Sequence, residues 1–161
     1  MSSMTESAQS TVHSWITAIC AWTQDVVGSK WSLYSGVWPT DYTKPAIMWR
    51  VTGIDVRVLG LSSYEIEQRL TATVLADDPI EQNAAVLQLL VELGAAVKIP
   101  LQAAERRFLT ISEPKGNLNA NVNTTGTTEG QITVTCTRRT GRRPVEEISL
   151  MQFVNYKSNM R

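Results

Sequence analysis

The sequence predicts a single α+β domain, in which a mostly antiparallel or mixed sheet carries two main helices packed on one face. Apolar and polar residues alternate in two long stretches, residues 47–58 and 64–76, as strands with one buried face require. The second stretch leads directly into a helix with a clear start at Asp78-Pro79. At 161 residues, the chain suits one domain with its own core.

The first expected element is an amphipathic helix from about Ser10 to Val27, with Gly28 as its stop. Its apolar residues recur at spacings of three and four: Val12, Trp15, Ile16, Ile19, Trp22 and Val26. The polar residues 1–9 before it are candidates for a flexible start.

All five tryptophans lie in the first fifty residues and concentrate large apolar area there. Trp15 and Trp22 lie on the apolar stripe of the helix, which favours the core. Trp31 and Trp38 fit a core position or a subunit contact equally well, because tryptophan is common in both. The stretch from Ser35 to Pro45 predicts a loop.

The first alternation changes phase partway along. Apolar residues occupy odd positions before the change and even positions after it: Ile47, Trp49 and Val51, then Ile54, Val56 and Val58. A shift of one residue at Thr52-Gly53 predicts a β-bulge, which keeps the apolar side buried. A turn between two short strands is the alternative, since glycine fits either structure.

The second alternation predicts a strand with one wet face. Its apolar residues are Tyr64, Ile66, Leu70, Ala72, Val74 and Ala76. Glu65, Glu67 and other polar residues face the opposite way. Because Leu61-Ser62-Ser63 joins the two strands closely, we expect an antiparallel hairpin.

The second helix begins at an expected cap. Asp78 can accept a hydrogen bond from the first turn, Pro79 suits the first helical position, and Glu81 can complete a capping box. We expect the helix to end at Gly94. One apolar stripe is expected to face the sheet: Ile80, Ala84, Leu87, Leu90 and Val91.

Shorter elements follow. Ala95 to Ile99 and Arg106 to Ser112 predict short strands that end before prolines. Residues 115–130 are rich in Asn, Thr and Gly and predict a polar loop or extended arm. Gln131 to Arg139 alternates strictly and predicts a strand, whereas the tail from Val145 to Tyr156 fits helix and strand equally well.

No residue pattern predicts a catalytic, cofactor-binding or metal site, so we expect no enzyme and no cofactor. His13 is expected to be an ordinary helix residue, and the capping role already explains Asp78 in the pair Asp77-Asp78. Cys20 and Cys136 have no metal or redox spacing and are expected to be buried free thiols. No apolar run approaches the roughly 20 residues that cross a bilayer, so we expect a soluble protein without a membrane partner.

Fifteen basic and fifteen acidic side chains balance, so no global charge recruits nucleic acid. One basic cluster surrounds a turn: Arg138, Arg139, Arg142 and Arg143. Three interpretations stay open, namely a solvated turn, a subunit or partner contact, and a nucleic-acid contact. Glu65 and Glu67 could pair with this cluster between identical subunits.

The order of these elements resembles the tail terminator or tail completion proteins of bacteriophage tails. The likeness lies in the first helix before a Trp- and Pro-containing strand, the Arg69 to Asp78 strand that runs into a capped helix, and a late strand. That strand reads Gly130-Gln131-Ile132-x-Val134-x-x-x-x-Arg139. The resemblance covers residues 12–140.

This resemblance implies a subunit of a homo-hexameric ring that caps the head-proximal end of a tail tube and joins it to the neck. The implied partners are the tail tube protein, a neck or connector protein and, non-specifically, DNA in a central channel. The implied location is the virion, after assembly in the host cytoplasm. The four arginines are then candidates for lumen or subunit contacts, and Asn117 to Gly130 for an arm that reaches a neighbour.

Two other functions remain open. The chain could be another neck component, such as a connector or head-completion protein. It could also be a monomeric ligand-binding domain or small enzyme, which would have a deep pocket.

Overall fold

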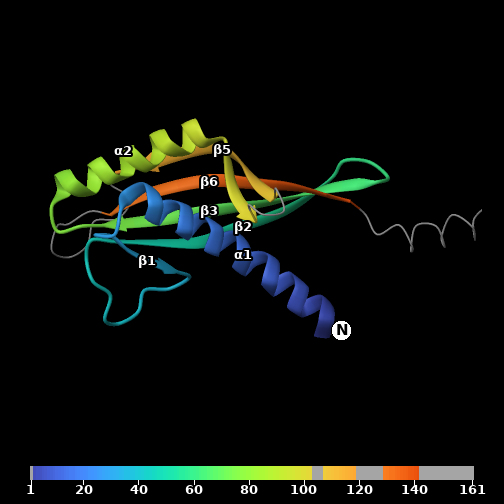
Figure 1. Ribbon diagram of the computed structural model, residues 1–161, viewed down its shortest axis with the longest axis horizontal. Coiled ribbons are helices and arrows are strands. Elements are labelled where there is room, and N and C mark those ends of the chain that lie inside the picture. The colour runs from blue at the N-terminus through green and yellow to red at the C-terminus, as the bar shows by residue number, and fades with distance from the viewer. Residues whose placement is uncertain (1, 103–106, 119–128, 142–161) are drawn as a thin grey trace, which may run out of the picture.

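The computed structural model describes residues 2–102, 107–118 and 129–141 (Figure 1). It confirms the α+β class, with a mixed, curled sheet and both helices on one face of that sheet. The elements follow in the order α1 (Ser2–Val27), β1 (Ser32–Ser35), β2 (Ala46–Val58), β3 (Ser63–Leu75), α2 (Pro79–Ala96), β4 (Lys98–Gln102), β5 (Arg107–Asn117) and β6 (Gly130–Gly141).

The six-stranded sheet has the order β1-β2-β3-β6-β5-β4. Only the β1–β2 pair is parallel among the described strands, and the other neighbours run antiparallel. The late strand β6 therefore lies in the middle of the sheet, between β3 and β5. The hairpin of β2 and β3 extends beyond the helices at one end of the molecule (Figure 1).

The predicted β-bulge is present. The pairing of β2 with β3 shifts register between Val51 and Gly53, and β2 continues without a break through this point. The alternative of two short strands joined by a turn is therefore wrong. At the bulge, the Thr52 and Thr71 hydroxyls lie 3.0 Å apart and share a hydrogen bond. The predicted antiparallel hairpin with β3 is confirmed.

Helix α1 begins at Ser2, well before the expected start at Ser10, so residues 2–9 are helical. These residues contain no Gly or Pro that would stop a helix. They are mostly polar, so no apolar periodicity predicts a helix there. The helix ends where expected, since Gly28 has φ 89° and donates its N–H to the Gln24 carbonyl at 2.9 Å.

The core lies between the sheet and the two helices. On α1, Trp15, Ile16 and Ile19 are buried against it. The Trp49 indole on β2 donates a hydrogen bond of 3.0 Å to the Thr23 hydroxyl, and both side chains are buried. This bond fixes α1 against the sheet without leaving a polar group unpaired.

Helix α2 turns a different face to the sheet from the one that its sequence predicts. Its buried residues are Gln82, Ala85, Val86, Leu89 and Leu93. In the expected stripe, Ile80, Leu87 and Val91 are instead more than half exposed. Glycines on the sheet favour this orientation, because a Cβ at Gly130 would lie 2.6 Å from Val86 Cγ2 and one at Gly116 2.5 Å from Leu90 Cδ1.

The cap of α2 is confirmed in part. The Asp78 carboxylate accepts a hydrogen bond of 3.0 Å from the Ile80 N–H, with Pro79 in the first turn. Glu81 forms an ion pair with Lys30 at 2.6 Å, rather than the expected capping box. The helix also runs past Gly94 to Ala96, and Val97 adopts the positive φ at its end.

Strands β4 and β5 pass through the prolines that were expected to end them. Pro100 lies within β4, which is tolerated because β4 is an edge strand. Pro114 lies within β5 at a register shift between Ser112 and Lys115. Strand β6 confirms the predicted Gln131 to Arg139 strand.

Several expectations lie outside the described residues. They are the middle of the polar arm at 119–128, the tail from Val145 to Tyr156, and Arg142 and Arg143.

Candidate functional site

The first candidate surface is the apolar face of the β2–β3 hairpin beyond the bulge. Ile54, Val56 and Val58 alternate along β2 and are 54%, 62% and 65% exposed. On β3, Tyr64 and Ile66 pair with Val58 and Val56, and so lie on the same face. The hairpin end adds Leu59 and Leu61, which are also exposed. A contiguous exposed apolar surface of this kind marks an interaction site.

The opposite face of the same hairpin is charged. Arg57 lies directly across from Glu65, and Glu65 lies directly across from Arg139. Alternating charges in such a row attract one another. Glu65 therefore has basic neighbours within its own chain, whereas the sequence suggested a partner in another subunit. Glu67 lies on the same face, beside Asp55.

The second candidate surface is the outer face of α2, formed by Ile80, Ala84, Leu87 and Val91. Beside it, an apolar groove of about 430 Å³ runs between α2 and the end of β5. Its lining includes Leu87, Leu90 and Leu118. This surface lies over the body of the sheet, whereas the hairpin face lies beyond the helices (Figure 1).

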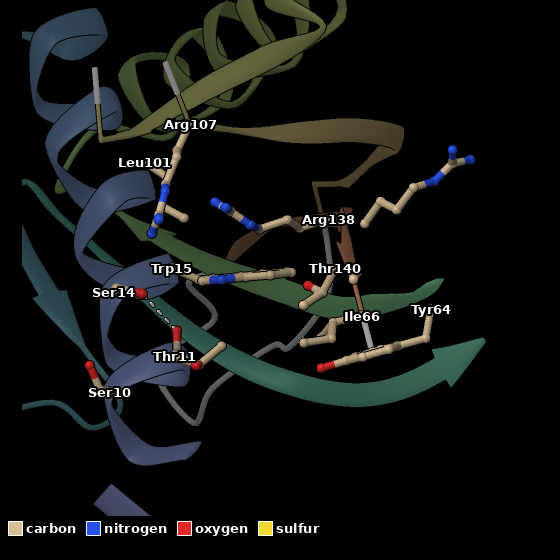
Figure 2. Close-up of a pocket in the computed structure, with 12 residues that line it drawn as sticks. Ser10, Thr11, Ser14, Trp15, Tyr64, Ile66, Leu101, Arg107, Arg138 and Thr140 are labelled. Atoms are coloured by element: carbon tan, nitrogen blue, oxygen red, sulfur yellow. Dashed lines mark hydrogen bonds between the residues drawn. The ribbon is translucent and has the colours of Figure 1, made fainter. Parts of the chain in front are cut away.

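A cationic cavity of about 610 Å³ lies between α1 and the sheet. Arg107 and Arg138 point into the same space beside Trp15 (Figure 2). Hydroxyl residues of α1 and β6 complete the polar lining, together with Arg139: Ser10, Thr11, Ser14 and Thr140. The Ser14 hydroxyl donates a hydrogen bond of 2.9 Å to the Thr11 carbonyl.

A smaller cavity of about 260 Å³ adjoins the first, since both are lined by Arg107, Arg138 and Arg139. Its lining also includes Lys98, which pairs with Thr110 of β5 on the face of the sheet that points away from α1. No acidic residue lines either cavity in the described part of the chain.

Arg138 lacks one hydrogen-bond partner. Its Nη1 atom is buried without one, and among the described residues only Gln68 Oε1 shares this state. Gln68 lies on the same face of the neighbouring strand β3, opposite Cys136. An unpaired buried donor costs free energy, so an unpaired guanidinium nitrogen needs an explanation.

The two predicted tryptophan candidates have different environments. Trp31 is 7% exposed and belongs to the core, which favours the core position over a contact. Trp38 is half-buried in the loop after β1, where its ring packs against Tyr34 and Tyr42 at centroid distances of 5.7 and 4.8 Å.

The remaining titratable groups have structural explanations. Burial raises the pKa of the Cys136 thiol to about 12 and that of the half-buried Cys20 thiol to about 11, so both are protonated at neutral pH. His13 is exposed on α1, next to Thr17. Across the residues that the structure describes, no group of His, Cys, Asp or Glu is arranged to hold a metal ion. None of the described helices is long and apolar enough to span a membrane.

Comparison of the sequence with protein-family models and with curated proteins gives no match.

The sequence pointed to some of these sites and missed others. The basic pair Arg138 and Arg139 was visible as a cluster, but Lys98 and Arg107 come from other strands and only the fold brings them near. The sequence predicted that the bulge keeps Ile54, Val56 and Val58 buried, and this is wrong, since all three are more than half exposed. Their alternation is the same as that of a half-buried strand, so the pattern could not show the exposure. The outer face of α2 was visible as an apolar stripe but was assigned to the core.

Proposed function

We propose that this chain is an assembly subunit that forms a homo-oligomeric ring at the head-proximal end of a phage or phage-like tail tube. There it stops growth of the tube and joins the tail to the neck. The apolar hairpin face of one subunit docks on the outer face of α2 in the next.

The observation that carries the proposal is the presence of two separate exposed apolar surfaces on one small domain. A closed ring of more than two subunits uses head-to-tail contacts, which require two different surfaces on each subunit. Val56 and Val58 lie on one of these surfaces, and Leu87 and Val91 on the other. Burial of this exposed apolar surface in an assembly lowers the free energy of the protein.

The position in the virion rests on the resemblance in element order to tail terminator proteins. That resemblance also supplies the number six and the partners, namely the tail tube protein and a neck or connector protein. Non-specific contact with DNA in the channel belongs to the same proposal, with Arg138 and Arg139 as candidate residues.

The test uses two sets of variants. In the hairpin variant, Ile54, Val56 and Val58 are all replaced by Thr, which keeps strand propensity but adds hydroxyl groups that resist burial. In the α2 variant, Leu87 and Val91 are replaced by Gln. Arg57→Thr, on the opposite face of β2, is the matched control.

We expect negative-stain images of the wild type and of Arg57→Thr to show rings, and those of either variant alone to show none. A mixture of the two variants should form one productive contact and hence a heterodimer, because each variant retains the surface that the other lacks. Circular dichroism checks that each variant is folded. Rings in both variants would refute this mode of assembly.

A monomeric ligand-binding domain is the second candidate function, and the cationic cavity is the observation that favours it. It predicts that the wild type itself forms no rings under these conditions.

A further inference from the structure

We propose that segment 145–156 covers the apolar hairpin face of its own chain while the subunit is free. That face consists of Ile54, Val56, Val58, Tyr64 and Ile66. In the ring, α2 of the next subunit would take the place of the segment, and this consequence rests on the proposed function. The cover itself does not depend on the ring.

The hairpin face continues the core side of the sheet. Ile54 pairs with Gln68, and Gln68 pairs with Cys136, and both of these partners are buried. Farther out on the same side, Val56 and Val58 are exposed, because the hairpin extends beyond the helices (Figure 1). One more element on this side would extend the layer that the two helices form over the sheet.

Strand β6 brings the chain to this face. Its last residue, Gly141, pairs with Ser63, the first residue of β3, at the outer part of the hairpin. Beyond Gly141, β6 has no further residue of β3 to pair with, and Pro144 has no N–H to donate to a neighbouring strand. The residues that follow therefore start beside the exposed apolar surface.

Segment 145–156 lies outside the described residues, but its sequence suits this position. Seven of its twelve residues are apolar or aromatic, so it needs an apolar surface to pack against: Val145, Ile148, Leu150, Met151, Phe153, Val154 and Tyr156. The hairpin face is about 17 Å long, from the five residue steps between Ser63 and Gln68. Twelve residues span about 18 Å as a helix and about 40 Å as a strand, so either conformation is long enough.

The cavity of about 610 Å³ beside α1 supplies space for side chains of the segment. Tyr64 and Ile66 line it and also belong to the hairpin face, so the two surfaces are continuous. Trp15 lies on its α1 side, and Gly141 is part of its lining (Figure 2). The described chain thus ends at the edge of a space with apolar walls, and side chains that enter it gain contacts with Trp15 and Ile66.

The experiment measures how fast a thiol reagent modifies a cysteine placed on the hairpin face of the full chain. Val56→Cys is the reporter, and Val58→Cys is a second reporter on the same face. Arg57→Cys, on the opposite face, is the control. The wild type gives the background from Cys20 and Cys136, whose raised pKa values make them slow to react. Circular dichroism checks that each variant is folded.

Each reporter is combined with two changes in the segment. Leu150→Ser with Phe153→Ser removes apolar contacts, and Gln152→Ser with Asn155→Ser is the matched control. We expect the Leu150 and Phe153 changes to speed modification of both reporters about tenfold or more, because the covered thiol reacts only when the segment is displaced. The matched control should leave these rates unchanged, and Arg57→Cys should react equally fast in every case.

A dilution series separates this cover from the ring. Protection by the segment of the same chain is independent of protein concentration, whereas protection by a neighbouring subunit is lost on dilution. Reporter rates that do not respond to the Leu150 and Phe153 changes would overturn the cover, as would protection that disappears on dilution. The last result would still support the proposed assembly, and a concentration-independent cover without any rings would contradict the assembly alone.

Discussion

Val97 is the residue at which α2 turns into β4, and its backbone has φ 61° and ψ −37°. A β-branched residue rarely adopts positive φ, because its branched Cβ crowds the backbone. The turn is nevertheless fixed, since the Val97 carbonyl accepts a hydrogen bond of 2.7 Å from the Ile111 N–H on β5. The side chain is 54% exposed and contributes little burial.

We therefore predict that Val97→Gly stabilises the protein by about 1 kcal/mol. Relief of strain of order 1–3 kcal/mol outweighs the added entropy of glycine in the unfolded chain. The measurement is urea unfolding monitored by circular dichroism. Val37→Gly, at an exposed loop position without positive φ, is the control and should not gain stability. A lower midpoint for Val97→Gly than for the wild type would contradict the strain at this position.

Charged residues of a candidate site were predictable from the sequence only where they are adjacent in the chain. Arg138 and Arg139 are adjacent and stood out as a pair. Arg107 and Lys98 are single cations in unremarkable segments, and nothing in one sequence indicates that β5 and β6 become neighbours. The cationic cavity is thus a product of strand order.

At the scale of elements, the sequence predicts helix α2 correctly but predicts the wrong buried face for it. The helix is apolar on two sides, so spacings of three and four fit both Ile80, Leu87, Val91 and Ala85, Leu89, Leu93. Periodicity identifies a stripe but cannot decide between two of them. The choice depends on glycines of distant strands that receive Val86 and Leu90.

The start of α2 gives the most direct test of an element. We predict that Asp78→Ala lowers the free energy of unfolding by about 1 kcal/mol, because the Ile80 N–H loses its acceptor. Asp77→Ala, which removes the neighbouring exposed carboxylate, should change it by much less. The measurement is again urea unfolding of both variants. Equal stability of the two variants would show that the hydrogen bond from Ile80 N–H to Asp78 does not stabilise the helix.

The strands divide in the same way between predictable and unpredictable features. A phase change of one residue at Thr52-Gly53 predicted the bulge, because side-chain alternation is a local property. Pro100 and Pro114 led to wrong predicted ends for β4 and β5. Proline is tolerated at an edge position in β4 and at a bulge in β5, and only the assembled sheet defines these positions.

At the scale of the whole molecule, the two exposed apolar surfaces require an explanation together. A single exposed patch could serve one partner, but the hairpin face and the outer face of α2 occupy different parts of the domain. Head-to-tail association of identical subunits uses both at once. The fold class was predictable from local patterns, whereas these surfaces were not, because exposure is decided by what the rest of the chain leaves uncovered.

The charged face of the hairpin fits this assembly. Arg57, Glu65 and Arg139 lie side by side across three strands, and these charged side chains keep that face of the hairpin hydrated. Contact is then directed to the apolar side. Glu65 thus has arginine neighbours in its own chain, and Arg138 lines the cavity on the other face of the sheet.

The first measurement is the solution mass of the wild-type protein by light scattering after size-exclusion chromatography, over a range of protein concentrations. Ring assembly predicts a mass that rises to about six times the subunit mass of 17.9 kDa. A mass of 17.9 kDa at every concentration would contradict self-assembly through these surfaces.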